Sequence, residues 1–129
     1  MERWSASAGG QSWREAVSKP IKIDKYLSYH YSGASGDFNL IHIDNEFARS
    51  AGLNGIILQG LCTMGITANR LIKDEDPATL KSIRVRFASP VHPEDELELE
   101  TEEKDKQLRF RVRNQSGEEV ITKGRAAYR

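Results

Sequence analysis

The sequence contains almost no cysteine and no long hydrophobic run. Cys62 is the only cysteine among 129 residues, which excludes both a disulfide within these residues and a zinc site built on several cysteines. No stretch approaches the roughly 18 consecutive apolar residues that a membrane-spanning helix needs, and residues 1–18 hold no apolar run of signal-peptide length. These absences predict a protein of the reducing cytoplasm that has no membrane partner.

The sequence also lacks an excess of charge of either sign. Its 19 Lys and Arg residues are matched by 19 Asp and Glu residues, which excludes the strongly basic surface of a dedicated nucleic-acid-binding protein. A chain of 129 residues is the size of one ordinary domain and can bury about two-thirds of its unfolded surface. We predict a single domain over residues 19–129, preceded by a flexible arm of small and polar residues at 1–18.

The first half of the domain carries the signals of short helices joined by loops. Asp24 stands where it can begin a helix that ends near Tyr31. Glycine, serine and asparagine predict a loop over residues 32–40. Asp44 can then cap a short helix that ends at Ala51, just before a glycine.

The longest predicted helix covers residues 56–73, and apolar side chains occupy almost every side of it. Such a helix is expected to be buried, with a sheet wrapped around it. The second half alternates hydrophobic with charged residues, which predicts strands with one dry and one wet face at residues 82–88, 96–101, 108–113 and 119–128. Glutamates and arginines on neighbouring strands are expected to pair across a solvated outer face. An antiparallel sheet around one buried helix is the α+β arrangement called the hot-dog fold, and its open edges favour a homodimer.

A glycine-rich loop before the short helix holds the side chains best suited to chemistry. Asp37 and His42 lie close together in the chain, and a carboxylate beside an imidazole can orient a water and move protons near neutral pH. Gly36 permits a tight turn, while Ser35 and Asn39 can bond to the loop's own backbone. The pattern therefore indicates a braced acid–base pair.

The same loop also fits a purely structural role. In that interpretation Asp37 and Asn39 are turn residues and His42 is a packing histidine, and the spacing alone leaves both interpretations open. His42 and Asp44 would supply only two metal ligands, so no metal site is predicted. Cys62 falls on the buried helix and is expected to pack rather than react.

Three ordered segments resemble the MaoC-like dehydratases, and among them the R-specific enoyl-CoA hydratases called hydratase 2. The first segment is YSGASGDFNLIHID, whose matching positions, with one alanine beyond it, are Tyr31, Ser35, Gly36, Asp37, Asn39, Ile41, His42, Asp44 and Ala48. The second, ILQGLCTMG, is similar to the family's opening of the central helix. The third, VRFASPVHPEDELE, is similar to a strand entry of the family. Together the segments lie within about residues 31–100.

The resemblance implies that Asp37 and His42 are the catalytic pair and that the Gly60 backbone N–H donates to a thioester oxygen. The residues that would support the loop or contact the substrate are Ser35, Gly36, Asn39 and Gln59. Two positions depart from the family. Leu40 replaces a proline, and Gln59 replaces a histidine, so this position keeps a hydrogen-bonding group that cannot titrate.

The reaction implied is R-specific hydration of 2-enoyl-CoA thioesters, or the reverse dehydration, through a water held by Asp37 and His42. It requires an acyl-CoA partner and no cofactor. One alternative is a hot-dog acyl-CoA thioesterase, which would carry a catalytic carboxylate on the central helix, but residues 59–72 contain no Asp or Glu. The other is one subunit of a heterodimeric 3-hydroxyacyl-thioester dehydratase, in which this chain would be the active half.

Overall fold

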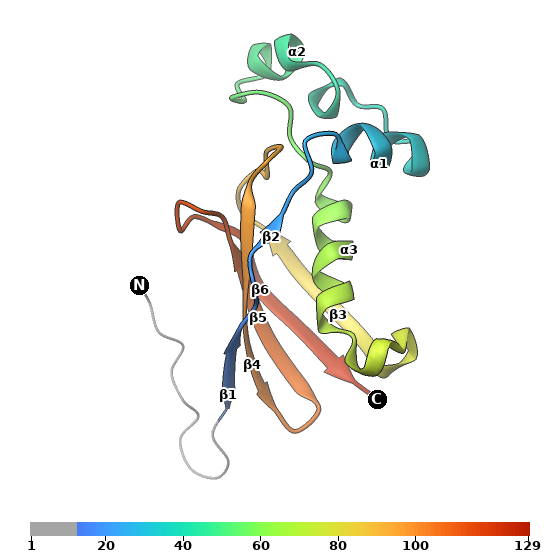
Figure 1. Ribbon diagram of the computed structural model, residues 1–129, viewed down its shortest axis with the longest axis vertical. Helices are drawn as coiled ribbons and strands as arrows, with labels where there is room; N and C mark the ends of the chain where they lie inside the picture. Colours follow the sequence, from blue (N-terminus) through green and yellow to red (C-terminus); the bar gives the residue numbers. More distant parts are fainter. Residues whose placement is uncertain (1–12) are drawn as a thin grey trace.

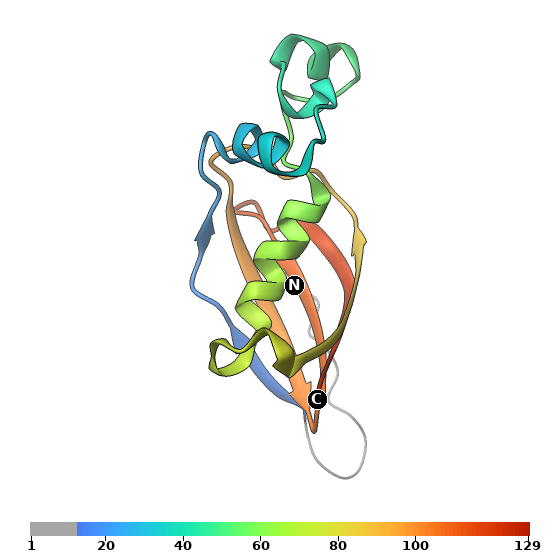
Figure 2. The ribbon, with the colours of Figure 1, turned by 90° about the vertical axis from the view of Figure 1, so that its right-hand side faces the viewer.

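The computed structural model describes residues 13–129, which form an antiparallel sheet with one long helix on its face and two shorter helices beyond its end (Figures 1 and 2). The strands are β1 (Arg14–Val17), β2 (Ile21–Lys22), β3 (Leu80–Phe87), β4 (Glu96–Lys104), β5 (Gln107–Arg113) and β6 (Glu119–Tyr128). The helices are α1 (Leu27–Ser35), α2 (Asn45–Ser50) and α3 (Gly60–Leu71), with 3-10 turns at Leu40–His42, Lys73–Glu75 and Pro77–Thr79.

The strand order is β1-β4-β5-β6-β3, and the short β2 pairs with β4. Alternate residues of β4, β5 and β6 point to the face that α3 covers, and their largest buried side chains include Leu97, Phe110 and Ile121. Cys62 and Leu71 of α3 join the same hydrophobic cluster. The structure therefore confirms the hot-dog arrangement expected from the two-residue alternation.

Only one side of α3 is buried, so the expectation of a helix covered all round is wrong for this chain. Cys62, Thr63, Thr67 and Leu71 face the sheet, whereas Leu61 is 68% exposed. The sheet of a single chain is one layer, and it can cover only the side of the helix that lies against it. The opposite side keeps its apolar residues at the surface.

Two helix boundaries differ from the prediction because tertiary hydrogen bonds determine them. Helix α3 begins at Gly60 rather than at residue 56, since the N–H groups of Ile57 and Leu58 donate to the carbonyls of Ile41 and Val91. Helix α1 continues past Tyr31 into the segment predicted as a loop, and it ends at Ser35. The cap of α2 is as predicted, because an Asp44 side-chain oxygen accepts from two backbone N–H groups of the first turn.

The N-terminal boundary also differs. Residues 14–17, within the arm predicted to be flexible, form β1 and pair with residues 100–103 of β4, so the prediction is wrong for this stretch. The remainder of that arm, residues 1–12, lies outside the described residues.

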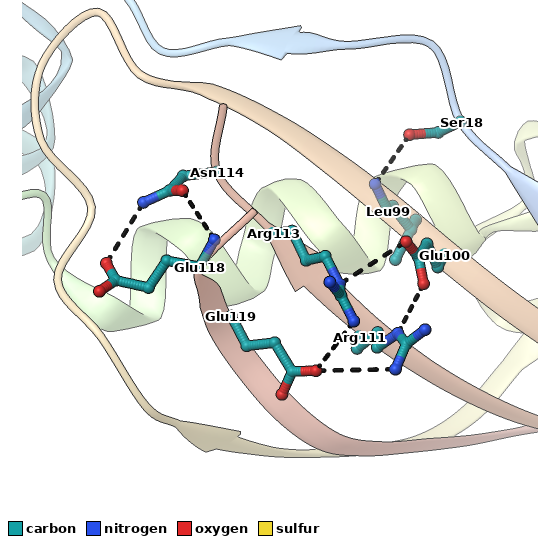
Figure 3. Close-up of polar contacts among 8 residues, drawn as sticks. All are labelled: Ser18, Leu99, Glu100, Arg111, Arg113, Asn114, Glu118 and Glu119. Carbon is teal, nitrogen blue, oxygen red and sulfur yellow. Dashed lines mark hydrogen bonds and ion pairs between the residues drawn. The ribbon is translucent and has the colours of Figure 1, made fainter. Parts of the chain in front are cut away.

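The outer face of the sheet carries the predicted ladder of ion pairs. Glu100 lies opposite Arg111 across the β4–β5 pair, with Nε of Arg111 donating to a Glu100 oxygen at 2.5 Å. Figure 3 shows that Arg113 and Glu119 extend this network. The face is less solvated than predicted, since Glu102 is only 1% exposed and Arg111 only 7% exposed. Long charged side chains can cover one another in this way only when each is paired.

Because Arg111 is buried and ion-paired, we expect Arg111→Ala to lower the free energy of unfolding by about 3 kcal/mol, since it leaves a buried carboxylate with fewer partners. Arg125→Ala, at an exposed position of β6, is the matched control and should change the free energy of unfolding by about 0.5 kcal/mol or less. Urea unfolding of both variants measures the difference. Equal losses would contradict the view that pairing within the ladder stabilises the sheet.

Candidate active site

The loop after α1 is braced by its own side chains. Gly36 ends α1 with a left-handed backbone (φ 80°), and its N–H donates to the carbonyl of Ser32. The Asp37 N–H donates to Oγ of Ser35 at 3.1 Å, and Oδ1 of Asp37 accepts from the N–H of Asn39 at 3.2 Å. Oδ1 of Asn39 in turn accepts a hydrogen bond from the backbone N–H of Ile41. These contacts hold the loop in one conformation directly before His42.

The structure brings Asp37 and His42 together. Oδ2 of Asp37 lies 3.6 Å from Nε2 of His42, and the two side chains are 48% and 9% exposed, respectively. This separation is longer than a good direct hydrogen bond, and it is the kind of gap that a single water can bridge. The carboxylate is therefore open to solvent while the imidazole is held in the interior.

A backbone carbonyl orients the His42 ring. Nδ1 of His42 lies 2.8 Å from the carbonyl oxygen of Ile57. A carbonyl only accepts hydrogen bonds, so the neutral ring carries its hydrogen on Nδ1 and leaves a lone pair on Nε2. That lone pair and Oδ2 of Asp37 are two proton acceptors directed at one small region. Sequence reasoning missed Ile57, because a backbone carbonyl leaves no signature in a residue pattern.

The N-terminus of α3 follows directly after this carbonyl. Gly60 is the first residue of α3, and the N–H groups of a first helical turn have no partner within the helix. The helix dipole adds partial positive charge at the same place. A Cβ on Gly60 would lie 3.2 Å from the ring of Phe87, so the close approach of that ring favours glycine here. The arrangement suits an oxygen that gains negative charge.

An apolar groove of about 320 Å³ begins at Gly60. Leu58, Thr63, Phe87, Val91 and Val120 line it together with that glycine. Phe87 was not singled out as a site residue, although it belongs to the third segment that carries the family resemblance. The groove is suited to an alkyl chain that extends from the start of α3.

Two side chains of the helix α3 region, Cys62 and Lys73, have structural explanations. Burial raises the pKa of the Cys62 thiol, which keeps it in the unreactive protonated form. Lys73 forms an ion pair with Glu103 at 2.7 Å and lies over the ring of Tyr128.

Among residues 13–129, no three His, Cys, Asp or Glu side chains gather as a metal site would require. Within that same range, every helix is too short or too polar to cross a membrane.

Comparisons with known proteins show what this chain is similar to. A family model described as "MaoC like domain" matches residues 10–124. The peroxisomal multifunctional enzyme type 2 of Mus musculus is 39% identical over 92 residues, which cover 68% of this chain and 12% of that protein. A probable enoyl-CoA hydratase 2 of Dictyostelium discoideum is 39% identical over 88 residues, covering 65% of this chain and 29% of that protein. The chain thus spans less than a third of either relative.

A solved structure agrees over a larger share of its own length. The R-hydratase PhaJ1 from Pseudomonas aeruginosa, in its unliganded form, superposes with a TM-score of 0.74 at 25% identity. The alignment covers 90% of this chain and 79% of that one.

The hydrogen bond from the His42 ring predicts its tautomer. For the neutral ring of His42, we expect ¹⁵N NMR to find a hydrogen on Nδ1 and none on Nε2, because the Ile57 carbonyl accepts from Nδ1. The exposed His30 serves as the internal reference for a ring without such a constraint. A hydrogen on Nε2 of His42 would contradict the proposed orientation of the pair.

Proposed function

The chain belongs to the MaoC-like domain family, and from that premise we propose that it catalyses R-specific hydration of 2-enoyl-CoA thioesters or the reverse dehydration. The observation that carries the proposal is the convergence of Oδ2 of Asp37 and Nε2 of His42, 3.6 Å apart. The proposal is supported by a relative named probable enoyl-CoA hydratase 2 and by the structural likeness to an R-hydratase.

The proposed mechanism begins with one water that donates both of its hydrogens, one to Nε2 of His42 and one to Oδ2 of Asp37. A lone pair on its oxygen is then directed at C3 of the enoyl group. As the new C–O bond forms, one of the two acceptors takes a proton from the water. The electrons of the C2=C3 bond move onto the thioester carbonyl. C2 then takes the same proton back from that acceptor as the carbonyl re-forms, which completes the addition and returns Asp37 and His42 to their starting state.

The thioester oxygen carries negative charge halfway through this reaction. In the proposed pose it accepts a hydrogen bond from the N–H of Gly60, at the start of α3. A donor that is already oriented in the free protein stabilises that charge without rearrangement. The acyl chain lies in the apolar groove that begins at the same residue.

We also propose that the active form is a homodimer. Strand β3 is at one end of the described sheet and has a neighbour on one side only. Phe87 at the end of this strand and Leu61 on the adjacent helix are both exposed apolar side chains. A second copy would cover them and extend the sheet. The cytoplasmic location of this chain stays a prediction. The word peroxisomal in the names of two relatives applies to those relatives.

A first prediction from this proposal concerns catalysis. Asp37→Asn and His42→Ala should each lower the rate of crotonyl-CoA hydration by at least about 100-fold, because each removes one proton acceptor. His30→Ala, an exposed histidine on α1, is the control and should keep the wild-type rate. The rate is followed by loss of enoyl absorbance, with chiral analysis of the product.

Two outcomes would contradict the proposed reaction. Near-wild-type turnover in both variants would remove the acid–base pair from the mechanism. Release of a free thiol from the thioester, without loss of the enoyl group, would favour the thioesterase alternative. Activity of the purified chain alone distinguishes a complete enzyme from one subunit of a heterodimer.

The second prediction concerns assembly. Sedimentation equilibrium should give twice the chain mass of 14.6 kDa, and Leu61→Asp should shift the protein toward the monomer because it places a charge in the proposed interface. Val17→Asp is the matched control, since Val17 is equally apolar and exposed but lies on β1, at the other edge. A monomeric wild-type protein, or equal effects of the two variants, would contradict this interface.

A further inference from the structure

Gln59 is a buried polar residue whose side chain turns away from the helix that it begins. It is 2% exposed and occupies the N-cap position of α3, yet its side chain makes no capping hydrogen bond. Nε2 instead donates to the carbonyl oxygen of Ser28 at 3.0 Å and to Oγ of Ser32 at 2.9 Å. Both serines lie on α1 and are themselves buried. The side chain therefore joins the start of α3 to α1.

The hydrogen-bonding chemistry determines how this amide is oriented. The carbonyl of Ser28 can only accept, so the NH₂ group of Gln59 must face it. The second amide hydrogen is used by Ser32. A neutral amide can make both bonds from one nitrogen, whereas each nitrogen of an imidazole carries at most one hydrogen. This is the position at which the resembling family has histidine, so glutamine makes a different connection here.

Packing alone does not account for an amide at this position. Oε1 of Gln59 and Oγ of Ser28 are buried and have no hydrogen-bond partner. A buried polar atom without a partner costs stability, and an apolar side chain of similar size would avoid that cost. The two N–H donations to α1 are thus the contribution that a hydrophobic residue could not make.

Four consecutive residues connect all the groups of the proposed site. The Ile57 carbonyl holds the His42 ring, the Leu58 N–H is anchored to Val91, and Gly60 supplies the N–H at the start of α3. Gln59 adds the connection to α1, the helix that ends directly before Asp37. Its hydrogen bonds to α1 are made by its side chain, so a substitution can remove them.

We propose that Gln59 is a positioning residue, which holds the end of α1, and with it Asp37, at the correct distance from His42 and the Gly60 N–H. The link runs from Gln59 to Ser32, whose carbonyl accepts from Gly36, the residue before Asp37. This inference rests on the proposed hydratase function. Misplacement of a catalytic group by about 1 Å can cost on the order of 100-fold in rate.

The test is Gln59→Met, which preserves length and packing but removes both donors. We expect kcat for crotonyl-CoA hydration to fall by about 10- to 100-fold, with KM within about two-fold of wild type, because the groove and the Gly60 N–H are retained. Amide hydrogen exchange over residues 27–39 should become faster. The matched control is Thr67→Val, which removes a buried hydroxyl of the same helix whose bond, to the Thr63 carbonyl, stays within α3.

Ser32→Ala removes one of the two acceptors, so it should cause a smaller fall in kcat than Gln59→Met. Its effect should largely disappear when it is combined with Gln59→Met, since both changes break one connection. The inference is overturned if Gln59→Met retains kcat within two-fold of wild type. It is also overturned if Thr67→Val loses as much activity, because the effect would then follow general destabilisation.

Failure of the proposed function would look different. In that case wild-type protein would hydrate no 2-enoyl-CoA, whereas hydrogen exchange would still report whether Gln59 holds α1. Faster exchange over residues 27–39 in Gln59→Met, and not in Thr67→Val, would support the positioning role independently of turnover. Unchanged exchange would overturn it.

Discussion

The geometry of the candidate site depends on the extended run of residues 57–59 that precedes α3. Its backbone is held from two directions, by Ile41 and by Val91, before the chain turns into the helix. Because the run is extended, the carbonyl of Ile57 is free to orient His42. The first N–H of α3 is then presented a short distance along the chain. Had the helix begun at residue 56, these groups would have been used within the helix itself.

The sheet supports this run without taking part in the proposed chemistry. Its inner face forms the hydrophobic core with α3, and its outer face is covered by paired charges that include Glu100, Glu102 and Arg111. Pairing between neighbouring strands thus accounts for part of the balance between acidic and basic residues. A neutral chain is fully compatible with a charged site, since the proposed reaction needs one carboxylate, one imidazole and one backbone N–H.

Local patterns predicted the elements well wherever local physics determines them. The alternation of Leu108, Phe110 and Val112 with arginines identified a strand with one buried face, and Asp44 identified the start of α2. The prediction was wrong where an apolar run fits both a helix and an extended segment, as at residues 56–59. It was also wrong at residues 14–17, where polar composition suggested a flexible arm but pairing with β4 supplies the missing hydrogen bonds.

The sequence by itself determined the fold class, the family resemblance and the two side chains of the proposed acid–base pair. The fold class follows from the two-residue alternation, which hydrophobic burial translates directly into structure. The resemblance, rather than the spacing alone, singled out the two side chains. Only the tertiary structure decided the tautomer favoured for His42, the start of α3 and the partners of Gln59. Each depends on a hydrogen bond between residues far apart in sequence, such as that from Gln59 to Ser28. No residue pattern records which carbonyl will face which side chain, because the folded sheet and helices bring them together.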